Sequence, residues 1–253
     1  MATLPVDEQV RILRNDGLVV VPGLLGAEPC AALRRIAGEQ LAAHAGPVEY
    51  EADLGYPGAP ASHEAEGGRT IRRLLNAWAR DEAFRGWAAG APIRRWMQTY
   101  FGEPAMLSLA HHNCVMTKHP RFGSLTGWHR DFRYWAFERD DMVSVWLALG
   151  DETDANGALH LIPGSHCADI AAGRFDERKF LRDDLDENRA LIDRAIVPTL
   201  RAGDAMFFHC NTLHAAGRNR LDAVKFSLVF TYHAASNHPL PGTRSEAKGS
   251  VAL

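Results

Sequence analysis

Two histidines and an aspartate in this chain have the residue types and the order of a metal site. His129 and Asp131 form a His-x-Asp pair, and His214 supplies a second imidazole much further along the chain. Two histidines and one carboxylate form the facial triad that binds Fe(II) in non-haem oxygenases and leaves coordination positions open. If His129 and Asp131 lie at the end of a strand, their side chains share one face because strand side chains alternate. A remote strand must then bring His214 to that face.

Other histidines are weaker candidates. His209 is the alternative to His214, but the spacing of the two gives them opposite parity on a regular strand. On a predicted strand over 105–117, only one of His111 and His112 can face inward, and parity with Cys114 and Met116 selects His112. We interpret His112 and Met116 as walls of a substrate pocket, with a cross-strand hydrogen bond as the alternative role of His112.

Aromatic side chains surround the metal motif. They either fill the core or shield the reactive centre from solvent, since aromatic rings bury easily. This aromatic group consists of Trp128, Phe132, Tyr134 and Trp135. Of these, we assign Trp135 to the substrate pocket.

Composition excludes several classes of protein. The 253 residues, 46% of them hydrophobic, fit a single domain with a sizeable core. A net charge of −3 provides no basic surface for nucleic acid, and no apolar run reaches the roughly eighteen residues of a membrane span. The first residues lack a signal-peptide pattern, and the four cysteines form no CxxC pair, as expected of reduced cytoplasmic thiols. We therefore predict a cytoplasmic monomer or homodimer that acts on a small molecule, with neither nucleic acid nor membrane as partner.

Residues 1–103 read as helical and loop support for the core that follows. Apolar periodicity predicts helices over 6–16 and 27–43, and a β-branched strand over 18–21 separates them. Residues 46–70 have loop composition, and a helix over 81–101 should break near Gly90 and Pro92.

The core is predicted over residues 104–233. Short apolar runs separated by turn signals are typical of an antiparallel jelly roll, so the fold class is mainly β with flanking helices, a cupin-like double-stranded β-helix. The runs lie at 105–117, 142–149, 158–162, 195–200, 205–210 and 224–232. A charged, helix-prone insert over 167–194 interrupts them, and residues 236–253 read as a mobile tail.

Several motifs in order resemble the phytanoyl-CoA dioxygenase family of Fe(II)/2-oxoglutarate oxygenases, from about Asp16 to Tyr232. The motifs are Gly127-Trp128-His129-Arg130-Asp131, the turn from Asn156-Gly157 to Pro163-Gly164-Ser165-His166, Gly203-Asp204 before Phe207-Phe208-His209, and His214 with Gly217 and Asn219. The resemblance implies iron bound by His129, Asp131 and His214, with 2-oxoglutarate and O₂ as cosubstrates. It also implies hydroxylation of a C–H bond in a small organic molecule.

The resemblance further implies which residues contact 2-oxoglutarate. Trp146, Cys114 and Arg73 occupy positions that contact the cosubstrate in relatives. Where the family has an arginine for the distal carboxylate, this chain has Lys225. Lysine keeps the charge but cannot form a planar bidentate fork, so Arg218 and Arg220 remain alternatives for this role.

Two other functional classes use a similar barrel. A cupin-type enzyme holding Zn or Mn, such as an isomerase, would accept the same ligands, but it would have no use for Trp146 and a cationic clamp. A non-catalytic metal-binding protein would be expected to have lost a ligand. The substrate itself is not encoded by fold and triad.

Overall fold

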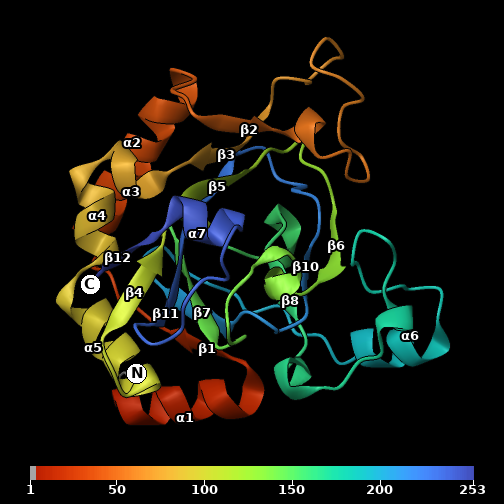
Figure 1. The fold of residues 1–253 in the computed structure, drawn as a ribbon. Coiled ribbons are helices and arrows are strands. Elements are labelled where there is room, and N and C mark those ends of the chain that lie inside the picture. Colours follow the sequence, from red (N-terminus) through yellow and green to blue (C-terminus); the bar gives the residue numbers. More distant parts are fainter. Residues whose placement is uncertain (1–3) are drawn as a thin grey trace.

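Two antiparallel sheets face each other across a shared apolar core (Figure 1). The computed structural model describes residues 4–253. The main path of the larger sheet runs β1-β9-β7-β11-β5-β3-β2, and β4 and β12 extend it beside β11. The smaller sheet has the order β6-β10-β8. This is the jelly roll that the sequence predicted.

The strands of the larger sheet are β1 (Leu18–Val21), β2 (Val48–Tyr50), β3 (Ile71–Leu75), β4 (Ala105–Ser108), β5 (Cys114–Lys118), β7 (Met142–Ala148), β9 (Ala205–His209), β11 (Lys225–Ala234) and β12 (Ser250–Ala252). Those of the smaller sheet are β6 (Thr126–His129), β8 (Leu159–Leu161) and β10 (His214–Ala216).

Strand β7 shows how the larger sheet separates two cores. Val145 and Leu147 point to the outer face and join the cluster beneath the helices. Trp146 and Ala148 point to the inner face and pack against β8 of the smaller sheet. Every residue of β7 and β11 is buried, so both faces of these two strands are covered. Alternation along them directs every second side chain toward the site.

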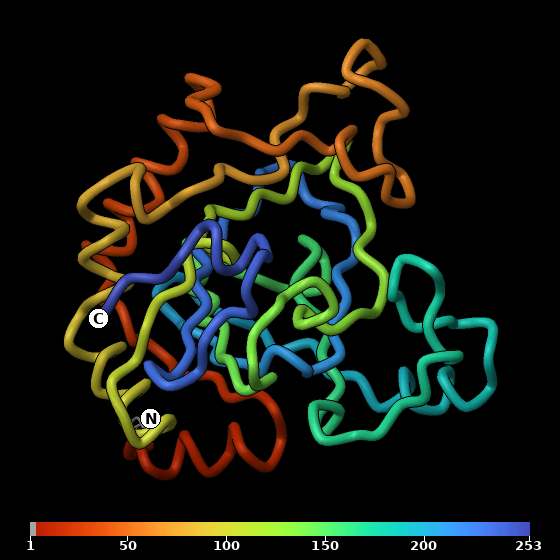
Figure 2. The backbone as a smooth tube through the Cα atoms, in the orientation of Figure 1, coloured from red at the N-terminus to blue at the C-terminus, as the bar shows by residue number. Residues whose placement is uncertain are grey.

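Helices from the N-terminal part cover the outer face of the larger sheet (Figures 1 and 2). Gly17, at φ 76°, ends the first helix in the left-handed conformation and starts β1 directly after it. Gly90 divides the predicted 81–101 helix in two, as expected. The helices are α1 (Val6–Asp16), α2 (Ala27–Ala42), α3 (Ala77–Arg80), α4 (Glu82–Ala88), α5 (Ala91–Phe101), α6 (Asp186–Ile192) and α7 (Arg244–Lys248). Among the described residues, no helix is long and apolar enough to span a membrane.

The C-terminal segment, which we predicted as a mobile tail, contains two regular elements. Strand β12 pairs with β4, which would otherwise leave an open sheet edge, and α7 precedes it. His111 Nε2 lies 2.7 Å from Ser245 Oγ on α7. The tail therefore closes over the barrel, and its polar, Pro- and Gly-rich composition concealed this packing.

Four other predicted segments have different bounds. The 105–117 run bends between β4 and β5, where His112 takes a positive φ of 32°. Residues 195–200 form only isolated bridges, at Ile196 and Leu200. Part of the 46–70 loop forms β2, and the 167–194 insert contains only α6 and short 3-10 turns besides loop (Figure 2).

Candidate metal centre and cosubstrate cavity

The three predicted metal ligands converge at one end of the smaller sheet. His129 ends β6 and lies directly opposite His214, the first residue of β10. Arg130 is extended, so Asp131 at the start of the 3-10 turn η2 (Asp131–Tyr134) keeps the parity of His129. One ligand atom from each residue lies within 4.8 Å of the others. The structure thus gathers two imidazoles and a carboxylate around one point.

Backbone carbonyls orient both imidazoles. His129 Nδ1 lies 2.8 Å from the carbonyl oxygen of Gly127, and His214 Nδ1 lies 2.9 Å from that of Thr212. We assign the proton of His129 to Nδ1, which leaves its Nε2 lone pair free. Burial opposes the charged form of His214, but the Asp131 carboxylate raises its pKa, so a metal would displace a proton from its Nε2. The two Nε2 atoms lie 3.8 and 3.5 Å from Asp131 Oδ1. Metal-binding histidines commonly donate their other ring N–H to a backbone carbonyl in this way.

The electrostatics of the centre also suit a cation. Burial and the neighbouring His214 hold the pKa of His129 well below its usual value, so that ring is neutral, as a metal ligand must be. Burial alone would raise the pKa of Asp131, but His112 and His214 outweigh it and hold the pKa well below its usual value. Within residues 4–253, Asp131 Oδ2 has no aligned hydrogen-bond donor, although His112 Nε2 lies 2.9 Å away. These buried acceptors fit a divalent metal.

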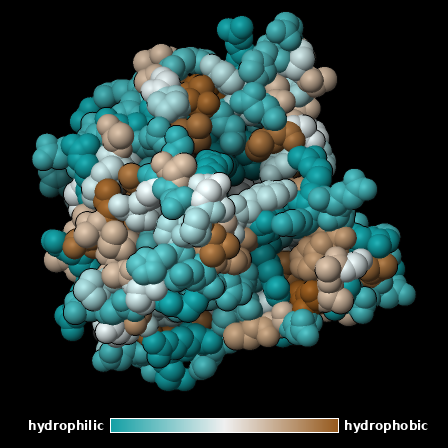
Figure 3. Space-filling model, in the orientation of Figure 1, coloured by the Kyte–Doolittle hydropathy of each residue, from teal (hydrophilic) through white to brown (hydrophobic). Residues whose placement is uncertain are grey.

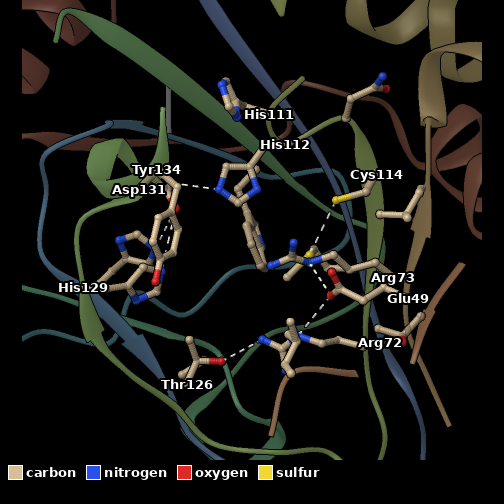
Figure 4. A pocket seen from close by; sticks show the side chains of 18 of the residues that line it. Glu49, Arg72, Arg73, His111, His112, Cys114, Thr126, His129, Asp131 and Tyr134 are labelled. Carbon is tan, nitrogen blue, oxygen red and sulfur yellow. Dashed lines mark hydrogen bonds and ion pairs between the residues drawn. The ribbon is translucent and has the colours of Figure 1, made fainter. Parts of the chain in front are cut away.

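A cavity of about 500 Å³ opens beside the triad, within the usual range for small-molecule sites. Nearly every predicted site residue lies on the wall of this cavity. Figure 4 shows His129 and Asp131 on one side, with Arg72 and Arg73 facing them. The predicted residues on the wall are Arg73, His112, Cys114, Met116, His129, Asp131, Trp135, Trp146, His214 and Lys225.

Lys225 faces the cavity but already has a carboxylate partner in the protein. Its Nζ lies 2.9 Å from Glu152 Oε2 and 3.2 Å from Ser227 Oγ. Trp146 Nε1 donates to the same carboxylate at 3.0 and 3.1 Å. We expected a buried Lys225 to need 2-oxoglutarate as the partner of its charge. Glu152 already balances that charge within the protein.

The alternative cations lie outside the wall. Arg218 is exposed and packs against Gly58. Arg220 is exposed and forms an ion pair of 2.7 Å with Asp154. Among the described basic residues near this end of β11, Lys225 is thus better placed than either arginine.

The remaining cosubstrate candidates share one side of the cavity. Arg73 Nε lies 3.3 Å from Glu49 Oε1, and this guanidinium points into the cavity (Figure 4). Burial raises the pKa of the Cys114 thiol to about 11, although Arg73 opposes that rise. Cys114 is therefore a neutral thiol near pH 7.

The other histidines have structural partners. His111 is fixed to α7 and stacks on Trp135, with ring centroids 4.8 Å apart. His209 Nδ1 accepts from the Asn211 backbone N–H at 3.1 Å and does not belong to the triad cluster.

The sequence did not predict several charged residues beside the cavity. Lys118 and Arg72 line it, and Glu152 lies behind Lys225. Lys118 shares the parity of Cys114 and Met116 on β5, so alternation alone could have found it. Glu152 follows β7 in a turn, where periodicity carries no signal.

Comparison with known proteins agrees with the geometry of the site. The family model described as phytanoyl-CoA dioxygenase (PhyH) matches residues 13–226. The chain belongs to this family. Its membership confirms the class that the motifs predicted, a 2-oxoglutarate-dependent non-haem iron dioxygenase whose reactants are 2-oxoglutarate and O₂.

Individual relatives are distant. The chain is 25% identical to a probable alpha-ketoglutarate-dependent hypophosphite dioxygenase of Stutzerimonas stutzeri, over 69% of this chain and 61% of that protein. It is 27% identical to an ectoine dioxygenase of Stutzerimonas stutzeri (strain A1501), over 91% of this chain and 77% of the relative. The crystal structure of EctD from S. alaskensis with 2-oxoglutarate and 5-hydroxyectoine shares the fold, with a TM-score of 0.77, 21% identity and coverage of 97% and 85%.

Proposed function

We propose that this dioxygenase binds Fe(II) through His129, Asp131 and His214 and oxidises a C–H bond of a small metabolite in the adjoining cavity. The observation that carries the proposal is the convergence of two oriented imidazoles and one buried carboxylate within 4.8 Å. Bound iron with 2-oxoglutarate supplies the oxidising power of the reaction. The protein contributes ligand orientation, charge and the exclusion of water.

Lys225 and Trp146 are the proposed contacts for 2-oxoglutarate. Both lie on the inner face of the larger sheet, and Trp146 pairs directly with Val229 of β11. Lys225 Nζ sits 5.1 Å from the Trp146 ring centroid, so the aromatic face also stabilises the cation. Cys114 and Arg73 complete that wall.

The outer part of the cavity indicates the class of the organic substrate. Trp135, Tyr134 and Tyr56 provide aromatic surface, while basic side chains gather at the mouth. The aromatic walls suit the carbon skeleton of a small molecule, and the cations favour one that carries a carboxylate or phosphate group. The basic residues are Arg133, Arg244 and Lys248.

Turnover of 2-oxoglutarate tests this proposal directly. Purified protein with Fe(II) and air should convert 2-oxoglutarate slowly to succinate, measured by NMR, and a matching small anionic metabolite should accelerate the conversion. The Asp131→Ala variant is the control and should produce none. If the iron-loaded wild type leaves 2-oxoglutarate untouched throughout a metabolite panel, a cupin-type enzyme of another class becomes the better account.

A further inference from the structure

Two buried lysines lie directly opposite each other on the cavity wall. Lys118 of β5 and Lys225 of β11 are paired residues in the antiparallel register. Both line the cavity, and each is 7% exposed. Like charges at directly opposed positions destabilise a sheet. Burial increases that cost unless an anion compensates.

Only one of the two lysines has a carboxylate partner. Glu152 Oε2 lies 2.9 Å from Lys225 Nζ. Lys118 Nζ donates to the carbonyl oxygen of Ser124 at 2.6 Å, and no ion pair within 4.0 Å is found for it in the described part of the chain. An ammonium group has three donors, so Lys118 keeps donors for a ligand that enters the cavity.

The surrounding backbone fixes the Lys118 stem in this direction. Gly157, at φ 75°, lies against the stem: a Cβ there would come within 3.2 Å of Lys118 Cγ and Cε. Asn219 Nδ2 donates to the Lys118 carbonyl oxygen at 2.9 Å. Gly157 and Asn219, which belong to the motifs that resemble the family, therefore position Lys118, which belongs to none of those motifs.

We propose that Lys118 and Lys225 together bind the distal carboxylate of 2-oxoglutarate, with Glu152 as the internal counter-ion of Lys225. The proposal rests on the function proposed above. Lys118 then takes one carboxylate oxygen and Lys225 the other, so two point donors replace the planar fork of a single arginine.

The charges around the inner cavity agree with a dianionic ligand. Four cations face three carboxylates there, which leaves one positive charge for the distal carboxylate. A divalent metal bound by Asp131 would leave one more positive charge, which would balance the carboxylate at the 2-oxo-acid end of the ligand. The cations are Arg72, Arg73, Lys118 and Lys225, and the carboxylates are Glu49, Glu51 and Glu152.

A lysine clamp differs from an arginine clamp in its response to pH. Burial, with the positive charge of Arg72, lowers the pKa of Lys118 to about 7 in the free protein. Above that pH, Lys118 must take up a proton to bind a carboxylate, so affinity falls as pH rises, by up to about tenfold per unit. The charged groups that face Lys118 are Glu51, Arg72, Arg218 and Lys225.

Equilibrium binding to the Mn(II)-loaded protein without O₂ tests the clamp. Lys118→Met should weaken the binding of 2-oxoglutarate by roughly ten- to hundredfold, the usual loss of affinity when a hydrogen bond between charged groups is removed. The probe 2-oxovalerate carries a methyl group in place of the distal carboxylate, and its affinity should not change. Arg95→Met, at an exposed position on α5 away from the cavity, is the control and should leave both affinities unchanged. Equal weakening of both 2-oxo acids by Lys118→Met would show a structural role only and overturn the proposal.

A second measurement needs no variant. Calorimetry of the wild type at pH 8 in two buffers of different ionisation enthalpy should show proton uptake with 2-oxoglutarate and none with 2-oxovalerate. Equal uptake with both ligands would place the protonation away from the distal carboxylate and would overturn the clamp while leaving the proposed function intact. A wild type that binds neither 2-oxo acid overturns both.

Discussion

The pair between Lys225 and Glu152 should behave as a buried ion pair in which neither partner can be removed alone. The two side chains are 5% and 1% exposed, and their charged atoms lie 2.9 Å apart. Removing one member of such a pair costs about 3–5 kcal/mol because the other charge stays buried. In Lys225→Met, Glu152 keeps donors from Trp146 and Ser227, so we expect a loss near the lower limit, about 3 kcal/mol. For a domain of this size, the melting temperature should fall by roughly 6–12 °C.

A double-mutant cycle separates the pair from its surroundings. Lys225→Met combined with Glu152→Gln should recover most of the stability that either substitution loses, because no charge remains unpaired. Urea unfolding at neutral pH measures all four proteins. The exposed pair Arg182–Asp184 is the control, and its coupling should stay below about 1 kcal/mol. If the double variant of the buried pair loses the sum of the two single losses, the ion pair does not exist in solution.

Three further predictions address the site and its histidines. Alanine at His129, Asp131 or His214 should each abolish Mn(II) binding measured by EPR while circular dichroism stays unchanged, and normal Mn(II) affinity would remove that residue from the ligand set. Because the pKa of Cys114 is raised to about 11, iodoacetamide should alkylate it slowly at pH 7, and 2-oxoglutarate with Zn(II) should protect it further. Peptide mapping checks this, and rapid labelling of Cys114 that 2-oxoglutarate does not affect would contradict its position on the wall. Burial, with the positive charge of His166, lowers the pKa of His209 to about 4, whereas the unfolded chain binds that proton near pH 6.5. Stability should therefore fall as pH decreases from about 6.5 to 4. His209→Asn should show a shallower fall in urea unfolding, and an unchanged slope would argue against a buried neutral ring.

Local patterns were enough to predict much of the scaffold and the shared face of two candidate metal ligands. The helix over 6–16 and the β-branched strand after Gly17 depend on residues close in sequence, and both appear with nearly the predicted bounds. His129 and Asp131 could be paired by parity because an extended Arg130 preserves the alternation. His214 was singled out by residue type and order and supported by the motif resemblance, but its place beside β6 could not be derived locally, since that pairing joins residues far apart in the chain.

Long-range packing explains what the sequence did not reveal. The partner of Lys225 is Glu152, which belongs to a turn after β7 and meets β11 only when the sheet forms. The C-terminal segment looks polar and irregular, yet it supplies the last strand beside β4. Its Ser245 also bonds His111 near the mouth of the cavity. None of these contacts leaves a periodic pattern in the sequence. Composition therefore predicted a turn after β7 and a mobile tail at the C-terminus.

The most direct test of the account is an anaerobic crystal structure of the protein with Mn(II) and 2-oxoglutarate. We predict one metal ion bound by His129 Nε2, His214 Nε2 and an Asp131 oxygen, with the 2-oxo-acid end of the ligand on the metal. The distal carboxylate should lie between Lys118 and Lys225. A metal ion bound elsewhere, or 2-oxoglutarate outside this cavity, would contradict the central claim.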